Sequence, residues 1–258
     1  MGVGEILAME RAQVSKNRRL FLPLMGGLAL LAWMESITST YNNDLGGLIG
    51  FIKALVGIYI ALIVARTILL GQDQAQSDAP VLPYFGNSLL IGLLVVLAAL
   101  PFAMTTFGLF HFAFGANDAI WSWIHEPMSD EWWTALPWDV ADRGLLAASA
   151  LVGVISVFVL SYVGARWGYC MPGVAVGRKP YGFLEGWRDS AGVVFPLVFA
   201  AWTVILIVSV VLGTVGFLLT FVHEWLGLAA FSLIEGVLGV AIPVVFVVAW
   251  QSHTGSDD

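Results

Sequence analysis

Three charged residues lie within stretches of sequence that are otherwise apolar, and they are the first candidates for chemistry. They are Glu35, Lys53 and Glu235. A charged side chain inside a lipid bilayer is energetically expensive, so it is usually paired and often marks a functional site. These residues are therefore expected either to form a structural ion pair or to take part in proton or ion transfer.

Glu35 and Lys53 are spaced so that they can pair. Glu35 lies eight residues before Asn43 and Lys53 lies ten residues after it. At a rise of roughly 1.5 Å per residue, the two reach similar depths on adjacent antiparallel helices. We expect a structural salt bridge that removes the cost of two isolated charges. The alternatives are a proton or ion step, or a depth shallow enough to meet water among the headgroups.

Glu235 has no cationic neighbour in the sequence. It lies about nine residues into the last apolar stretch if that stretch starts near Leu226, which places it roughly in mid-membrane. Desolvation favours the neutral form of a carboxyl group. We therefore expect Glu235 to be protonated, or to bond to a hydroxyl of Ser232, Ser209 or Thr214, in either a structural or a proton-linked role.

Composition defines the elements that carry these residues. The chain has 258 residues, of which 59% are hydrophobic and only 11% charged, and this excludes a water-soluble fold. Its apolar stretches are long enough to cross hydrocarbon, so we predict an all-α polytopic membrane protein with six transmembrane helices. The predicted order is a cytoplasmic segment 1–19, spans at about 20–40, 46–70, 87–112, 145–166, 193–222 and 226–250, and a cytoplasmic tail 251–258.

The distribution of basic residues predicts the orientation. If the N-terminus is cytoplasmic, nine of the 11 Lys and Arg residues flank the spans on the cytoplasmic side, as the positive-inside rule requires. We expect both termini in the cytoplasm and the protein in the cytoplasmic (inner) membrane of a prokaryote. The nine are Arg11, Lys16, Arg18, Arg19, Arg66, Arg166, Arg178, Lys179 and Arg188.

Two long connections have distinctive compositions. The outer connection joins the third and fourth spans, and in it five tryptophans alternate with acidic residues. This composition predicts an interfacial cap with rings in the membrane and carboxylates in water. The inner connection joins the fourth and fifth spans, and the helical spacing of its apolar residues at 183–187 predicts a short cytoplasmic amphipathic helix. Segment 71–86 is polar and contains proline, and is expected to be a loop. The tryptophans are Trp121, Trp123, Trp132, Trp133 and Trp138.

Basic residues surround the amphipathic segment of the inner connection. Such a composition attracts anionic lipid headgroups. Ordinary positive-inside anchoring and specific binding of a lipid or a protein partner both explain it. The predicted contact residues are Arg166, Arg178, Lys179, Trp187 and Arg188.

The sequence offers little for catalysis. It contains no nucleophile elbow, phosphate-binding loop, dinucleotide fingerprint or carboxylate pair at catalytic spacing, so neither an enzyme nor a cofactor is expected. His125 and His223 lack the i+3 or i+4 partner of a helical metal site, and the single Cys170 excludes a cysteine-based cluster. The spacing of Gly46 and Gly50 instead favours close helix packing.

One stretch resembles a known family. Ala165-Arg166, the run from Met171 to Arg178, and the run from Phe183 to Arg188 resemble the loop of bacterial six-span proteins such as the glycerophosphodiester phosphodiesterase membrane domain and related uncharacterised families. Residues 189–192 depart from that pattern, where the family commonly has Thr-Arg-Gly. The resemblance implies an integral membrane module, and without an attached phosphodiesterase domain no hydrolase activity is expected.

These observations favour a non-enzymatic membrane protein that acts by interaction. We expect a scaffold or an accessory subunit of a larger membrane complex. Its expected partners are membrane lipids and a membrane protein or further copies of itself, and the net charge of −7 does not suit nucleic acid. The alternative is a transporter or lipid-handling protein that uses Glu235 and the Glu35–Lys53 pair.

Overall fold

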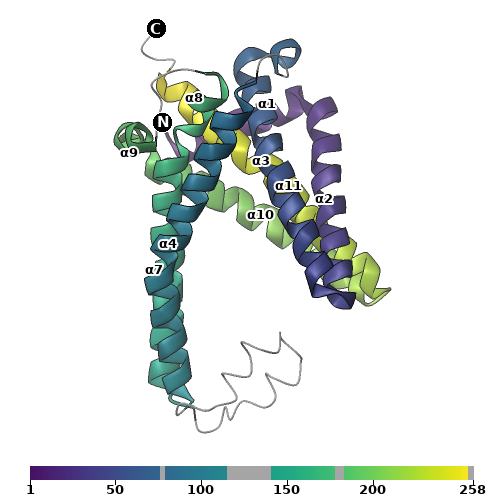
Figure 1. The fold of residues 1–258 in the computed structure, drawn as a ribbon, viewed down its shortest axis with the longest axis vertical. Coiled ribbons are helices and arrows are strands. Elements are labelled where there is room, and N and C mark those ends of the chain that lie inside the picture. Colours follow the sequence, from purple (N-terminus) through teal and green to yellow (C-terminus); the bar gives the residue numbers. More distant parts are fainter. Residues whose placement is uncertain (76–78, 115–140, 178–182, 255–258) are drawn as a thin grey trace. The chain divides into compact units, whose positions relative to one another are not determined.

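The computed structural model describes residues 1–75, 79–114, 141–177 and 183–254, which form helices and turns (Figure 1). Six helical spans are long and apolar enough to cross a membrane, so the predicted all-α polytopic fold is confirmed. The helices of these spans are α2 (Arg18–Tyr41), α3 (Asn43–Leu70), α4 (Val81–Ala113), α7 (Arg143–Gly168), α10 (Val194–Thr220) and α11 (Glu224–Thr254). The shorter elements are α1 (Val3–Lys16), η1 (Gln72–Gln74), α8 (Met171–Ala175), α9 (Phe183–Asp189) and η2 (Ser190–Gly192).

The N-terminal segment contains a helix that the sequence analysis did not predict. The backbone N–H of Gly2 donates to the carboxylate of Glu5 at 2.8 Å, which satisfies one of the free donors at the start of α1. Ile6 is fully buried, and α1 packs on α10 and α11. The helix ends at Asn17, whose side chain donates to the carbonyl of Gln13 at 3.1 Å.

The fourth helix starts earlier than expected. Residues 81–86 were predicted to be loop, but α4 begins at Val81. Pro83 lies in its first turn. Backbone N–H groups in the first turn make no hydrogen bond within the helix, so a proline there costs none. The described residues of this connection before Val81 include the 3-10 helix η1.

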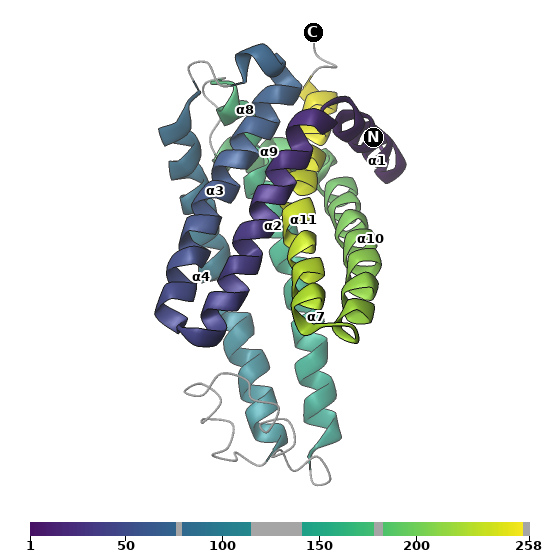
Figure 2. The same ribbon diagram turned by 90° about the vertical axis from the view of Figure 1, so that its right-hand side faces the viewer.

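The described residues fall into two compact units, residues 1–91 with 165–258 and residues 92–164. In the first unit, α11 is central and packs against α1, α2, α3, α8 and α10; Figure 2 shows it between α2 and α10. Its main hydrophobic core is shared by three helices. The buried members of that core are Phe21, Leu28, Ile60, Val64, Val240, Val244 and Val248.

A glycine lets α11 approach α2 closely. A Cβ atom added to Gly236 would overlap the backbone carbonyl oxygen of Met25 and would lie 2.9 Å from the Cβ of Ala29. Real Cβ atoms essentially never come that close to other heavy atoms. The contact between the two helix backbones therefore depends on the absence of a side chain at this position.

The second unit is an antiparallel pair formed by parts of α4 and α7. The hydroxyl of Ser149 donates to the carbonyl of Thr106 at 3.0 Å, and the backbone N–H of Asp142 donates to the carbonyl of Ala113 at 2.8 Å. The carboxylate of Asp142 accepts from the N–H of Gly144 at 2.8 Å and so caps the start of α7. Aromatic side chains close the pair near this end, with Phe107, Phe110 and Phe114 packed against α7 residues.

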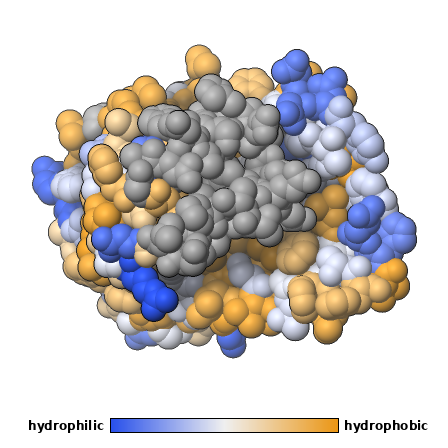
Figure 3. Space-filling view, turned by 90° about the horizontal axis from the view of Figure 1, so that it is seen from below, coloured by the Kyte–Doolittle hydropathy of each residue, from blue (hydrophilic) through white to orange (hydrophobic). Residues whose placement is uncertain are grey.

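The helices carry large apolar side chains on their outer surfaces as well as in the cores. Examples are Leu93 in α4, Val154 in α7 and Leu206 in α10, each more than half exposed. Figure 3 shows apolar side chains reaching the visible surface between polar patches. Helices that are apolar all round are typical of membrane spans.

Candidate functional site

The three charged residues inside the spans meet at one point. The Nζ of Lys53 lies 2.5 Å from a carboxylate oxygen of Glu35 and 2.5 Å from a carboxylate oxygen of Glu235. The three come from α3, α2 and α11, all within the first unit. We call Glu35, Lys53 and Glu235 the charge cluster. One ammonium group therefore serves two carboxylates.

The turn between α2 and α3 positions the first pair. Asn42 separates the two helices, and its side-chain oxygen accepts from the backbone N–H of Leu45 at 3.1 Å, which caps α3. Because the turn is so short, the two helices run antiparallel from a fixed register. The predicted pairing of Glu35 with Lys53 is present in the structure.

Two glycines of α3 make room for this arrangement. A Cβ at Gly46 would lie 2.8 Å from the Cα of Ser39, and a Cβ at Gly50 would lie 3.1 Å from the carboxyl carbon of Glu35. The close helix packing predicted from Gly46 and Gly50 is thus confirmed. Gly50 leaves the space into which the Glu35 carboxylate extends toward Lys53.

The expected partners of Glu235 were wrong. Within the described part of the chain, no hydroxyl of Ser232, Ser209 or Thr214 bonds to it, and its partner is Lys53, 182 residues away in sequence. The hydroxyls of Ser232 and Thr214 donate to the carbonyls four residues earlier in their own helices. Serine and threonine hydroxyls in helices commonly donate to a backbone carbonyl of the same helix. The carboxylate of Glu235 pairs instead with the ammonium group of Lys53, because α3 packs against α11.

The charge cluster lies well inside the helical spans. Glu35 is six residues before the end of α2, Lys53 is ten residues after the start of α3, and Glu235 is eleven residues after the start of α11. At roughly 1.5 Å per residue, these positions are about 9, 15 and 16 Å from the helix ends. The charges therefore lie about two to three helical turns inside the spans.

The cluster is not enclosed by the first unit. The side chains of Lys53 and Glu35 are 22% and 29% exposed, whereas that of Glu235 is 57% exposed. With all three groups ionised the cluster carries a net charge of −1, because two carboxylates face one ammonium. An acid-rich polar group thus reaches the outer surface of an apolar helix bundle.

The predicted contact residues of the inner connection differ in their surroundings: some contact each other and one is exposed. Arg166 donates a hydrogen bond to the backbone carbonyl of Trp187, and its guanidinium carbon lies 4.6 Å from the centre of the Trp187 ring. The ring of Trp167 lies 5.7 Å from that of Trp187. These residues hold α9 against the end of α7, so two of the predicted lipid-contact residues bind each other. Arg188 is exposed and pairs with Asp189 at 3.2 Å.

The expected helix over the amphipathic segment is present as α9, with Leu184 71% exposed. The remaining predicted contact residues, Arg178 and Lys179, lie outside the described residues. The predicted outer cap also lies outside them. Its tryptophans are Trp121, Trp123, Trp132, Trp133 and Trp138.

Sequence reasoning missed the role of Arg66. We took this residue as one more positive charge beside a span, but it is 5% exposed. Its guanidinium donates to the carbonyls of Ala75 at 2.9 Å, Ala175 at 2.8 Å and Gln74 at 3.0 Å. It therefore ties the end of α3 both to the following turn and to the end of α8. A basic residue at the end of a span is the only sequence signal, and it does not distinguish anchoring from this internal role.

Replacing Arg66 with methionine should destabilise the first unit. The change leaves the carbonyls of Gln74, Ala75 and Ala175 without their charged donor, and we expect a loss of about 2–4 kcal/mol in the free energy of unfolding. The measurement is unfolding in mild-detergent micelles as sodium dodecyl sulfate is added. Arg18→Met, at an exposed arginine, is the matched control. Equal stability of the two variants would contradict the assigned role.

Comparisons with known proteins add no assignment to this geometry. No protein-family model, curated protein or solved structure matches the chain. The resemblance of residues 165–192 to six-span proteins therefore remains a prediction.

Proposed function

We propose that this protein is a non-enzymatic accessory subunit of a larger membrane complex and that it docks through the charge cluster. The observation that carries the proposal is the 57% exposure of the Glu235 side chain about 16 Å from the start of an apolar span. A carboxyl group at this depth is rarely left to lipid and faces protein or water in most membrane proteins. A partner helix laid against α11 would cover it.

The charge of the cluster indicates the chemistry of the partner. With all groups ionised, a net charge of −1 is balanced by one cationic side chain, so we propose a partner helix with a lysine or arginine at matching depth. A second copy of this chain fits less well, because it would bring two negative clusters together. The exposed ring of Phe231, one helical turn before Glu235 on the same face of α11, would pack against the partner.

The proposed setting is the cytoplasmic membrane of a prokaryote with both termini in the cytoplasm. Met1 and the end of α11 lie at the same end of the first unit, where the hydroxyl of Ser252 donates to the sulfur of Met1 at 2.8 Å. The excess of Lys and Arg beside that end supports its cytoplasmic placement. Membrane lipids would surround the remaining apolar faces.

Cross-linking can test the docking surface directly. A photoreactive residue at the exposed Phe231 should cross-link, in intact membranes, one protein of constant mass whose attached peptide contains a transmembrane lysine or arginine. Glu235→Gln should reduce the yield about tenfold, because it removes the charge that the partner cation binds. The measurement is the amount of cross-linked product by mass spectrometry.

The controls separate docking from general effects. Glu224→Gln, at the exposed start of α11, should leave the yield unchanged, and a photoreactive residue at the exposed Leu206 of α10 should not give the same product. Cross-linking to lipid alone would refute the proposal. A product containing only a second copy would replace the proposed partner by a homo-oligomer.

A second candidate function is proton-linked or ion-linked transport or lipid handling. It is favoured by the sharing of one ammonium by two carboxylates, because the second carboxylate can take up a proton or a cation. In that case, liposomes that contain the protein would dissipate an imposed pH gradient and the same Glu235→Gln variant would abolish the effect. Gradient loss in the absence of any protein cross-link would favour this function over docking.

A further inference from the structure

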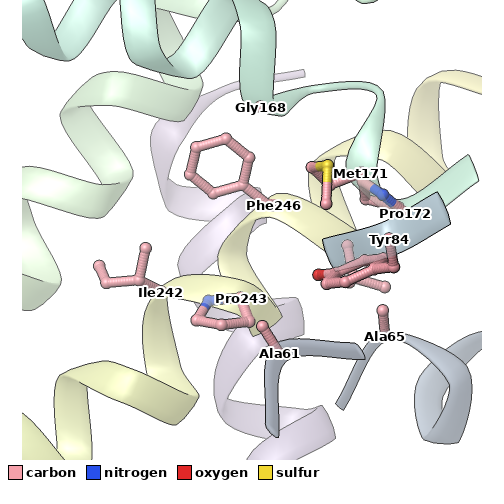
Figure 4. Close-up of a pocket in the computed structure, with 10 residues that line it drawn as sticks. Ala61, Ala65, Tyr84, Gly168, Met171, Pro172, Ile242, Pro243 and Phe246 are labelled. Atoms are coloured by element: carbon pink, nitrogen blue, oxygen red, sulfur yellow. The ribbon is translucent and has the colours of Figure 1, made fainter. Parts of the chain in front are cut away.

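A small cavity lies at the end of the first unit that carries the two termini. It has a volume of about 180 Å³ and is bounded by α3, the start of α4, the end of α7, α8 and α11 (Figure 4). Nine of its ten lining residues are aliphatic, glycine, proline, methionine or phenylalanine. Tyr84 is the tenth, and its hydroxyl is the one polar side-chain group in the lining.

The hydroxyl of Tyr84 has no hydrogen-bond partner among the described residues, although the residue is only 5% exposed. Figure 4 shows its oxygen directed into the space bounded by Met171, Ile242 and Phe246. Buried polar groups in folded proteins are almost always hydrogen-bonded. A buried water molecule needs about two to four polar partners, and the lining side chains offer one. The hydroxyl is therefore arranged to donate to an acceptor on an apolar ligand.

The volume of the cavity and its place in the helices limit the kind of ligand that it can hold. An apolar cavity of about 150 Å³ accommodates benzene, so this one fits a single ring or a short run of methylenes. Ala61, Tyr84 and Val247 lie nine, three and seven residues from the nearer ends of α3, α4 and α11. These counts correspond to about 14, 5 and 11 Å. The cavity therefore lies about one to three helical turns inside the ends of these helices.

We propose that this cavity binds the apolar part of a membrane amphiphile whose carbonyl oxygen accepts a hydrogen bond from Tyr84. An ester carbonyl of a lipid and a ring carbonyl of a quinone share this chemistry. The site is separate from the charge cluster, because Lys53 precedes Ala61 by eight residues in α3 and Glu235 precedes Ile242 by seven residues in α11.

Binding of defined probes to the full-length protein in mild-detergent micelles tests the proposal. The probes are dioctanoylglycerol, decylubiquinone and, as a ligand without a carbonyl, decylbenzene. We expect one molecule of at least one carbonyl probe per chain by native mass spectrometry. Tyr84→Phe should weaken its affinity about three- to tenfold, the effect of one hydrogen bond, and should leave decylbenzene unaffected.

Two further variants complete the test. Tyr59→Phe removes a hydroxyl from an exposed tyrosine of α3 and should bind like the unmodified protein. Ala61→Phe fills the cavity and should abolish binding of every probe. If Ala61→Phe fails to fold, Tyr84→Phe alone tests the proposal. Binding of dioctanoylglycerol alone identifies a lipid ester, and binding of decylubiquinone alone identifies a quinone. Absence of carbonyl-probe binding to the unmodified protein, or equal affinity in Tyr84→Phe and Tyr59→Phe, would overturn the proposal.

Discussion

Replacing Lys53 with methionine is expected to lower the free energy of unfolding by about 2–3 kcal/mol. The variant leaves the carboxylates of Glu35 and Glu235 next to each other without the ammonium group that both contact at 2.5 Å. Removing one partner of a fully buried ion pair costs roughly 3–5 kcal/mol, and the partial exposure of this cluster reduces that figure. Unfolding is followed by circular dichroism in mild-detergent micelles as sodium dodecyl sulfate is added.

The same experiment can show that the loss arises from charge. Combining Lys53→Met with Glu35→Gln and Glu235→Gln removes all three charges and should restore most of the stability, because no unpaired carboxylate remains. Lys16→Met, at an exposed lysine outside the spans, should change stability by less than about 0.5 kcal/mol. If Lys53→Met were as stable as Lys16→Met, the cluster would make no contribution to folding.

A larger side chain at Gly236 should be more damaging still. Gly236→Leu would force apart α11 and α2, because a Cβ there already overlaps the Met25 carbonyl oxygen and approaches Ala29. Backbone atoms cannot move aside as a flexible side chain can, so we expect a loss of about 3 kcal/mol or more. The midpoint of thermal unfolding in micelles and the yield of folded protein both report it.

Gly213 in α10 provides the matched control for this substitution. A Cβ at Gly213 meets no heavy atom within 4 Å. Gly213→Leu should therefore leave stability unchanged or raise it by up to about 1 kcal/mol, since leucine favours helix more than glycine does. Equal destabilisation by both substitutions would show that the loss at Gly236 does not arise from the contact with α2.

Local sequence spacing was sufficient to predict one half of the charge cluster. Glu35 and Lys53 lie on two helices joined at Asn42, so counting residues from the turn determines which side chains can meet. Glu235 could not be placed in this way. Its contact depends on how α11 packs against α3, and no short connection links those helices. The same reason explains the incorrect expectation of a hydroxyl partner.

The composition of the chain was sufficient to predict the spans, because six apolar stretches of this length are stable chiefly inside a membrane. Composition did not predict helix α1 or the role of Arg66. Ile6 became fully buried because α1 packs on α10 and α11, which lie far away in sequence. Arg66 reaches a carbonyl 109 residues later in the chain. Each depends on tertiary contacts that a pattern of apolar residues does not encode.

The central position of α11 has a consequence for how the protein is made. Among the six spans this helix comes last in sequence, yet α1, α2, α3, α8 and α10 all pack on it. The hairpin of α2 and α3 precedes it and carries Glu35 and Lys53, so the negative and the positive charge of this pair can neutralise each other before α11 is present. Glu235 arrives later in the chain, with α11. The acidic excess of the charge cluster is therefore created only when α11 packs against that hairpin.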